Sequence, residues 1–157
     1  MVPPTALPLA DILRRTPLFA TLTDLQLLRL VHGATKHRFR RDDLVLARGS
    51  ASHHLYVMLS GRAMESSGPT GNGVVLFRQL KPGDYFGECS LIDGQPYSAN
   101  VQCSTAADVL LIDGGRVASV MGNSPAFSMA IIQDLTERLR RANRHIGALA
   151  LGNVSDR

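Results

Sequence analysis

The stretch YFGECSLIDGQPYSANV, residues 85–101, decides how the rest of the chain is interpreted. Gly87 lets backbone N–H groups approach an anion closely, Glu88 can accept a hydrogen bond from a sugar hydroxyl, and Ser98 adds a small hydroxyl donor. A cradle for an anion normally also holds a positive charge, but residues 85–101 include no lysine or arginine. The stretch therefore raises the question of whether it is a working phosphate site or one that has lost its ligand.

Around this stretch, residues 35–113 alternate short runs of β-forming residues with glycine-rich turns. Strands spaced about 8–12 residues apart are typical of an all-β sandwich or barrel. The segment GPTGNG, residues 68–73, predicts a hairpin turn between two of these strands. The predicted strand runs are HRF (37–39), LVLA (44–47), HLYVML (54–59), VVLFRQL (74–80), ANVQC (99–103) and DVLLI (108–112).

Residues 8–34 precede the β zone and have a helical pattern. Thr23 is a suitable N-cap for a helix that follows it, and Gly33 is a suitable stop. Apolar residues recur at helical spacing at Leu25, Leu28 and Val31.

A long helix is predicted after the β zone, over residues 125–151, because Ser124 followed by Pro125 is a typical cap and first turn. Its apolar residues are spaced 3, 4, 3, 4 and 3 apart, which is a coiled-coil seam of about two and a half heptads. One interpretation is a helix packed on its own barrel. We favour a parallel homodimer, because residues 8–34 already cover the β zone and charged residues flank the seam. The seam residues are Ile132, Leu135, Leu139, Ala142, Ile146 and Leu149.

The composition sets the class of protein. A chain of 157 residues with 45% hydrophobic and 19% charged residues predicts one soluble globular unit. We expect no membrane association, since no apolar run approaches ~20 residues and no signal peptide is recognisable. Cys89 and Cys103 are predicted to be free thiols in a reducing cytoplasm. The net charge of +4 comes largely from 15 arginines, and we interpret the cluster Arg138, Arg140, Arg141 and Arg144 as a solvated helix face.

Four segments together resemble the cyclic-nucleotide-binding domain of CRP/FNR transcription regulators. They are LRRTPLFATLTD (13–24), LARGSASHHLYVMLSGRAMESS (46–67), LKPGDYFGE (80–88) and LTERLRRANRHIGALALGNV (135–154). The resemblance covers about residues 12–154, with landmark glycines at Gly49, Gly61, Gly83 and Gly87. It implies a mainly β fold with flanking helices. The expected architecture is a double-stranded β-helix (jelly roll) with an N-terminal helical cap and a long C-terminal dimerisation helix.

In that family residues 85–101 would be the phosphate-binding cassette, and the ligand would be cyclic AMP or another cyclic nucleotide. The resemblance implies that Gly87 offers its backbone, Glu88 binds the ribose 2′-hydroxyl and Ser98 binds the cyclic phosphate. The family usually has arginine before this serine, where the chain has Tyr97, so we predict weak or no binding of cyclic AMP. The expected ligand-side residues are Phe86, Gly87, Glu88, Cys89, Tyr97, Ser98, Ala99 and Asn143.

Three alternatives to this interpretation are open. A metal enzyme of cupin type is disfavoured because the adjacent His53 and His54 would point to opposite faces of a strand. A haem or redox sensor would use Cys89, although a lone cysteine is more often a small buried hydrophobe. A stand-alone binding module is also open, since the family's DNA-binding helix-turn-helix would follow Val154.

We therefore predict a non-enzymatic sensor and dimerisation unit of a bacterial CRP/FNR-like regulator. Residues 1–124 form the sensor, and residues 125–157 form the dimerisation helix and the start of a hinge. Its partners would be a second copy and a small effector. DNA would be bound only through a helix-turn-helix that this chain lacks.

Overall fold

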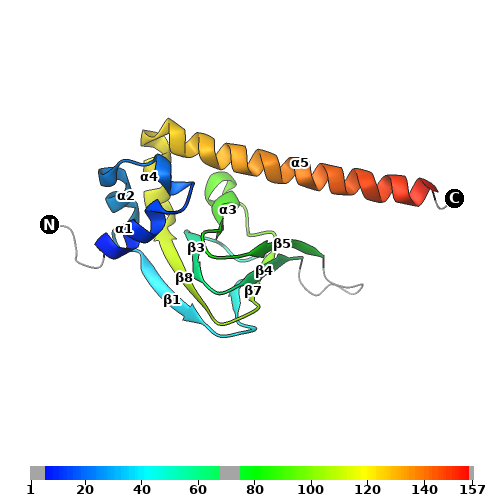
Figure 1. Ribbon diagram of the computed structural model, residues 1–157, viewed down its shortest axis with the longest axis horizontal. Coiled ribbons are helices and arrows are strands. Elements are labelled where there is room, and N and C mark those ends of the chain that lie inside the picture. The colour runs from blue at the N-terminus through cyan, green and yellow to red at the C-terminus, as the bar shows by residue number, and fades with distance from the viewer. Residues whose placement is uncertain (1–5, 68–74, 156–157) are drawn as a thin grey trace.

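The fold is built from two four-stranded antiparallel sheets that face each other (Figure 1). The computed structural model describes residues 6–67 and 75–155. The first sheet has the order β1-β8-β3-β6, with β1 Thr35–Phe39, β3 His54–Ser60, β6 Tyr85–Phe86 and β8 Ala107–Asp113. The second has the order β2-β7-β4-β5, with β2 Leu44–Leu46, β4 Ala63–Ser66, β5 Leu76–Leu80 and β7 Asn100–Cys103. The predicted mainly β fold with flanking helices is confirmed, and a jelly roll is consistent with it.

The helices are α1 Ala6–Arg14, α2 Asp24–Val31, α3 Glu88–Asp93, α4 Gly114–Asn123 and α5 Pro125–Ser155, with a short 3-10 turn η1 Phe19–Thr21. The Thr23 cap is confirmed, because its side chain accepts a hydrogen bond from the Gln26 backbone N–H, and the Gln26 side-chain oxygen accepts one from the Thr23 backbone N–H. The predicted face of α2 was partly wrong: Leu25 is 59% exposed, and Leu27, Leu30 and Val31 form the buried face. Helix α4 was not predicted from the sequence.

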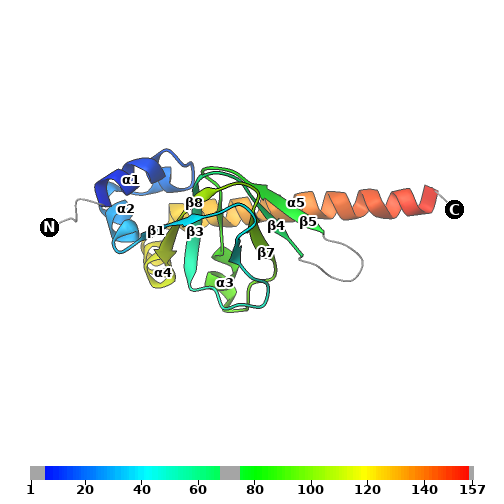
Figure 2. The ribbon, with the colours of Figure 1, turned by 90° about the horizontal axis from the view of Figure 1, so that it is seen from below.

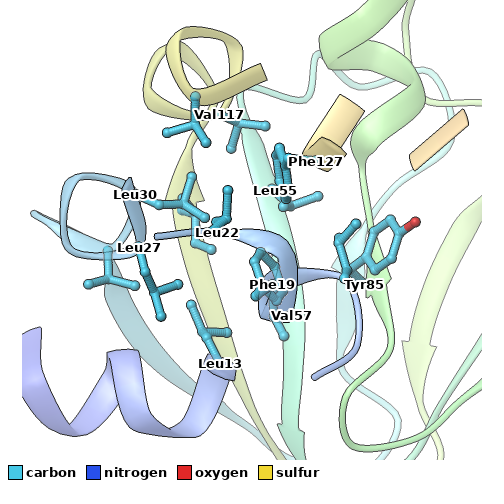
Figure 3. Close-up of a cluster of buried hydrophobic side chains, with 14 of the residues drawn as sticks. Leu13, Phe19, Leu22, Leu27, Leu30, Leu55, Val57, Tyr85, Val117 and Phe127 are labelled. Atoms are coloured by element: carbon cyan, nitrogen blue, oxygen red, sulfur yellow. The ribbon is translucent and has the colours of Figure 1, made fainter. Parts of the chain in front are cut away.

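Two hydrophobic clusters hold the fold together. The first lies where α1, η1, α2, α4 and the start of α5 cover the first sheet, and Figure 3 shows Phe19, Leu55 and Phe127 within it. The second lies between the two sheets and includes Met58, Phe86 and Tyr97. Because side chains alternate across a strand, β3 supplies Leu55 and Val57 to one cluster and Tyr56 and Met58 to the other.

Helix α5 runs from the first cluster past α3 and beyond the sheets, and its far end stands clear of them in both views (Figures 1 and 2). The predicted hairpin turn at residues 68–73 lies outside the described residues, but its flanking strands β4 and β5 do pair in antiparallel register. Within the described ranges, no helix is long and apolar enough to cross a membrane.

Candidate functional site

The cassette, residues 85–101, connects β6 to β7 through the short helix α3. Gly87 has φ +89°, a left-handed conformation, and a Cβ there would lie 2.9 Å from the His54 carbonyl oxygen. The requirement for glycine therefore has a packing cause as well as any role toward a ligand. At the other end, the Tyr97 N–H donates to the Ser50 carbonyl over 2.9 Å, and the Gly49 N–H donates to the Tyr97 carbonyl over 2.7 Å. The cassette is thus fixed to β3 and to the turn after β2.

Glu88, the first residue of α3, forms an ion pair with Arg138 of α5. The Arg138 Nη2 donates to Glu88 Oε1 over 2.5 Å, and the two side chains are only 22% and 4% exposed. Burial alone would lower the pKa of Arg138, but the Glu88 carboxylate and its hydrogen bond outweigh it, and the pKa is raised above its usual value. Arg138 therefore stays charged at neutral pH, and the ion pair joins the cassette to α5.

Asp134 and Tyr85 extend this ion pair into a network. The same Nη2 atom lies 3.1 Å from Asp134 Oδ2, one helical turn earlier, and that oxygen accepts a 2.6 Å hydrogen bond from the Tyr85 hydroxyl. Burial and the Asp134 carboxylate raise the pKa of Tyr85, so the phenol stays protonated and able to donate. The Arg138 guanidinium also lies 5.8 Å from the centre of the Tyr85 ring. We call Glu88, Asp134, Arg138 and Tyr85 the α5 clamp.

Tyr97 takes part in a second network, on the other side of β6. Its hydroxyl donates a short hydrogen bond to Glu65 of β4, whose carboxylate lies 3.3 Å from the Arg78 Nη2 on the neighbouring strand β5. Glu65 and Arg78 are directly opposite each other in the β4–β5 register. The Arg78 Nη2 also donates to the Tyr85 backbone carbonyl over 3.0 Å. We call Tyr97, Glu65 and Arg78 the Tyr97 triad.

The two networks answer the question of the missing positive charge. Arg138 of α5 and Arg78 of β5 bring two guanidinium groups close to the cassette from outside residues 85–101. Each is already paired with a carboxylate of the same chain. In the part of the chain that the structure describes, their Nε atoms are the only buried side-chain polar atoms without a hydrogen-bond partner. An anion that entered here would have to compete with Glu65 or Glu88.

Tyr97 occupies the core at the place where the family resemblance would put an arginine. Its ring is 6% exposed and belongs to the cluster between the sheets. Burial and Glu65 raise the pKa of its hydroxyl, so the group is a neutral donor at physiological pH. It therefore offers one hydrogen bond, already used on Glu65, and no charge.

The remaining predicted ligand-side residues differ in how deeply they are buried. Phe86 is fully buried, with its ring stacked on Tyr56 at 4.9 Å between centres. Ala99 is also buried, whereas Ser98 is exposed at the end of the cassette loop. Asn143 lies exposed on α5, five residues beyond Arg138. The structure thus brings Gly87, Glu88 and the Tyr97 triad together, but it gives Phe86 a packing role.

Cys89, which the alternative of a haem or redox sensor would use, is a free and exposed residue, so the expectation of a small buried hydrophobe was wrong. Burial of the sulfur and the adjacent Glu88 carboxylate raise its pKa to about 11. At neutral pH it is a protonated thiol, which is the unreactive form for oxidation or metal ligation. The described residues hold no group of three or more histidine, cysteine or acidic side chains suited to a metal.

Sequence reasoning missed the partners of the cassette. Arg138 was placed on a solvated helix face, which was wrong, because its side chain is only 22% exposed and lies against Glu88. Asp134 and Arg138 do have the spacing of a helical ion pair, which is a visible signal. Nothing in the sequence indicates that Glu65 faces Arg78, since that pairing depends on the register of two strands on either side of a hairpin.

Comparison with known proteins agrees with this geometry. The model of the cyclic nucleotide-binding domain family matches residues 36–124. The chain is 25% identical over 147 residues to a CRP-like cAMP-activated global transcriptional regulator of Mycobacterium tuberculosis (strain CDC 1551 / Oshkosh), and the match covers 94% of this chain and 66% of that protein. It is 33% identical over 114 residues to the cGMP-dependent 3',5'-cGMP phosphodiesterase A of Dictyostelium discoideum, covering 73% of this chain and 12% of that protein.

Among solved structures, the sensor domain of the transcriptional regulator DNR from Pseudomonas aeruginosa superposes with a TM-score of 0.78. The match covers 89% of this chain and 94% of that domain, at 16% identity, so it shows a shared fold. Two facing sheets with a cassette between them and a long C-terminal helix are the elements that this chain shares with that fold. The chain belongs to the cyclic nucleotide-binding domain family and is related to CRP-like transcription regulators, as the sequence resemblance predicted. It spans 66% of the length of the mycobacterial regulator.

Proposed function

We propose that this chain is the sensor and dimerisation unit of a CRP-like transcription regulator, and that it acts by coupling the state of the cassette to the position of α5. The observation that carries this proposal is the ion pair between Glu88 and Arg138. Glu88 begins the cassette helix and Arg138 lies in the middle of α5, so the pair spans the two elements that a regulator must connect.

The coupling follows from competition for one carboxylate. The Glu88 carboxylate already accepts a hydrogen bond from Arg138. A ligand that also donates to this carboxylate either displaces the guanidinium or shares the carboxylate with it. Displacement removes the ion pair that holds the middle of α5 against the cassette. A ligand that binds one position of α5 more tightly than another shifts the population toward that position.

We propose further that cyclic AMP is a weak ligand of the wild-type chain. The phosphate carries a negative charge, and Tyr97 offers it no countercharge. The nearest guanidinium on that side, Arg78, is engaged by Glu65. Burying a phosphate without a new charge partner leaves its lost hydration uncompensated.

Calorimetric titration with cyclic AMP tests this proposal on the wild type, Tyr97→Arg and the double variant Tyr97→Arg/Glu65→Gln. We expect Tyr97→Arg to improve affinity about ten- to a hundred-fold, the equivalent of one charge-assisted pair. The double variant should improve it more, because Glu65 would otherwise compete for the new arginine. Gln95→Arg is the control, since it adds the same charge in the same loop at an exposed position.

Micromolar or tighter binding by the wild type would contradict the proposal for Tyr97 and would assign the countercharge to Arg78 or Arg138. An equal gain from Gln95→Arg would show that net charge, not the position beside Ser98, controls affinity.

We also propose that the chain is a homodimer through α5. Three residues of the predicted seam, Ile132, Leu139 and Ile146, are 51%, 61% and 63% exposed in the single chain. Leu149 is 58% exposed and Ala142 is also exposed. A second copy of the same helix supplies an apolar surface with the same repeat, which is the complement that a parallel coiled coil uses. In a longer protein, DNA binding would reside in a separate domain.

A further inference from the structure

A second pocket lies between α2 and α4, at the end of the molecule opposite the free end of α5. Figures 1 and 2 both show these two helices side by side there. The pocket has a volume of about 260 Å³ and shares no residue with the cassette, the α5 clamp or the Tyr97 triad. It is lined by Gln26, Arg29, Arg116, Ser119, Val120 and Asn123.

The charges of this pocket are uncompensated. Two of its six lining residues are arginines, and none is acidic. Among the described residues, neither Arg29 nor Arg116 has a carboxylate within ion-pair distance. Two guanidinium groups that share one pocket repel each other, and an anion between them would turn that repulsion into attraction.

Arg116 is held in place at this pocket rather than free in solvent. It is half-buried, and its Nη1 donates to the Arg29 backbone carbonyl over 3.1 Å, near the C-terminal end of α2. That bond uses one of the five N–H donors of the guanidinium. Gln26 and Asn123 are also tied together, because the Gln26 Nε2 donates to the Asn123 carbonyl over 3.4 Å. These contacts between α2 and α4 fix the Arg116 and Gln26 side chains at the pocket.

The larger groove below α5 provides a contrast. It has a volume of about 470 Å³ and is lined by four cationic residues, Arg78, Lys81, Arg138 and Arg141. Each of these has an acidic partner, respectively Glu65, Asp84, Glu88 with Asp134, and Glu137. An anion in the groove would have to displace a carboxylate of the chain, whereas an anion in the α2–α4 pocket would displace only water.

We infer that the α2–α4 pocket binds a small oxyanion of the phosphate class through Arg29 and Arg116. Guanidinium groups donate two parallel hydrogen bonds to such oxygens, and the Ser119 hydroxyl supplies a further donor at the pocket. A volume of about 260 Å³ holds a phosphate or pyrophosphate group but leaves little room for a nucleoside attached to it. The site is separate from the cassette, and its test is independent of cyclic-nucleotide binding.

Amide NMR titration of the whole chain with inorganic phosphate and with pyrophosphate, at constant ionic strength, tests this inference. We expect saturable shifts at the amides of Gln26, Ser119 and Asn123, with pyrophosphate binding more tightly. Arg29→Gln and Arg116→Gln should each weaken binding about tenfold or more. Arg29→Gln is the cleaner variant, because Arg116 also holds α2 through its hydrogen bond.

Arg62→Gln is the matched control, since Arg62 is another exposed arginine with no ion pair within the described ranges. Amide shifts that do not saturate, or an equal loss of anion affinity in Arg62→Gln, would overturn the inference. The anions would then be attracted by the net positive charge of the chain rather than bound at the pocket. Saturable binding of an acidic peptide without any binding of pyrophosphate would also overturn it, because the two arginines would then recognise carboxylates of a protein partner.

Discussion

The two halves of α5 both carry apolar residues, but these residues have different surroundings. In the first half, Phe127 and Ile131 are fully buried against the helical cap, and Leu135 packs at the edge of the same cluster. In the second half, Leu139 and Ile146 are more than 60% exposed, and the helix stands clear of the sheets (Figure 1). The α5 clamp lies at the boundary between the two halves.

This difference shows how one helix can serve two purposes. The first half of α5 is stabilised by the domain itself, whereas the apolar face of the second half has no covering surface within the described chain. Helices in proteins gain most of their stability from the packing of an apolar face. We therefore expect changes in the first half to affect the folding of each chain, and changes in the second half to affect association.

The largest effect is expected in the first half. Phe127→Ala should lower the free energy of unfolding by about 3–5 kcal/mol, because it leaves a cavity beside Phe19, whose ring centre lies 6.0 Å away. Met129→Ala, two residues later and 52% exposed, is the control and should cost far less. Urea denaturation at two protein concentrations measures both. Equal losses would mean that the first half of α5 is not a part of the core.

The apolar face of α5 was predictable from the sequence, but its division into a buried and an exposed half was not, for a physical reason. The spacing of 3 and then 4 residues from Ile132 through Leu135 to Leu139 predicts a helix with an apolar face. The glycine-rich turns predict the strands. The spacing does not indicate where the helix leaves the domain, because Leu135 and Leu139 are the same residue type one turn apart. Only the extent of the sheets beneath α5 decides that.

The candidate site was predicted in outline for a similar reason. The cassette between Gly87 and Ser98 follows from its glycine and hydroxyl pattern. Its partners do not, since Arg138 lies 50 positions beyond Glu88 and Glu65 lies 32 before Tyr97. Such contacts depend on the packing of α5 and on strand register, which local sequence does not encode.

The next largest effect is expected at the start of the second half. Leu139→Glu should weaken dimerisation at least about a hundred-fold, because two carboxylates would face each other across an apolar seam. The unfolding of the monomer should change little, since Leu139 is 61% exposed. Sedimentation equilibrium compares it with Arg140→Gln, which changes the net charge by the same one unit outside the seam. A wild-type chain that is monomeric at high micromolar concentration would contradict the dimer proposal.

An intermediate loss of stability is expected at the boundary between the two halves of α5. Arg138→Met keeps the apolar stem of the side chain but removes the charge that pairs with Glu88, which is 4% exposed. Leaving that carboxylate buried without its partner should cost about 2 kcal/mol in thermal or urea unfolding. The loss should shrink in the double variant with Glu88→Gln, because the orphaned charge is then absent. A double variant as unstable as the sum of both single variants would show that the pair is not coupled.

The smallest effect is expected at Glu137, one residue before Arg138 and on the outer surface of α5. Its carboxylate lies 3.4 Å from both Arg141 and Arg144, but the three side chains are 48%, 69% and 65% exposed. Water screens such pairs, and holding long side chains together costs entropy, so Glu137→Gln should change the free energy of unfolding by less than about 0.5 kcal/mol. The same helix thus offers a buried and an exposed ion pair within two turns. If Glu137→Gln cost as much as Arg138→Met in the same denaturation series, burial against the cassette would not be what makes the α5 clamp strong. The surface of α5 would then have to be covered in solution, most simply by the second copy of the chain.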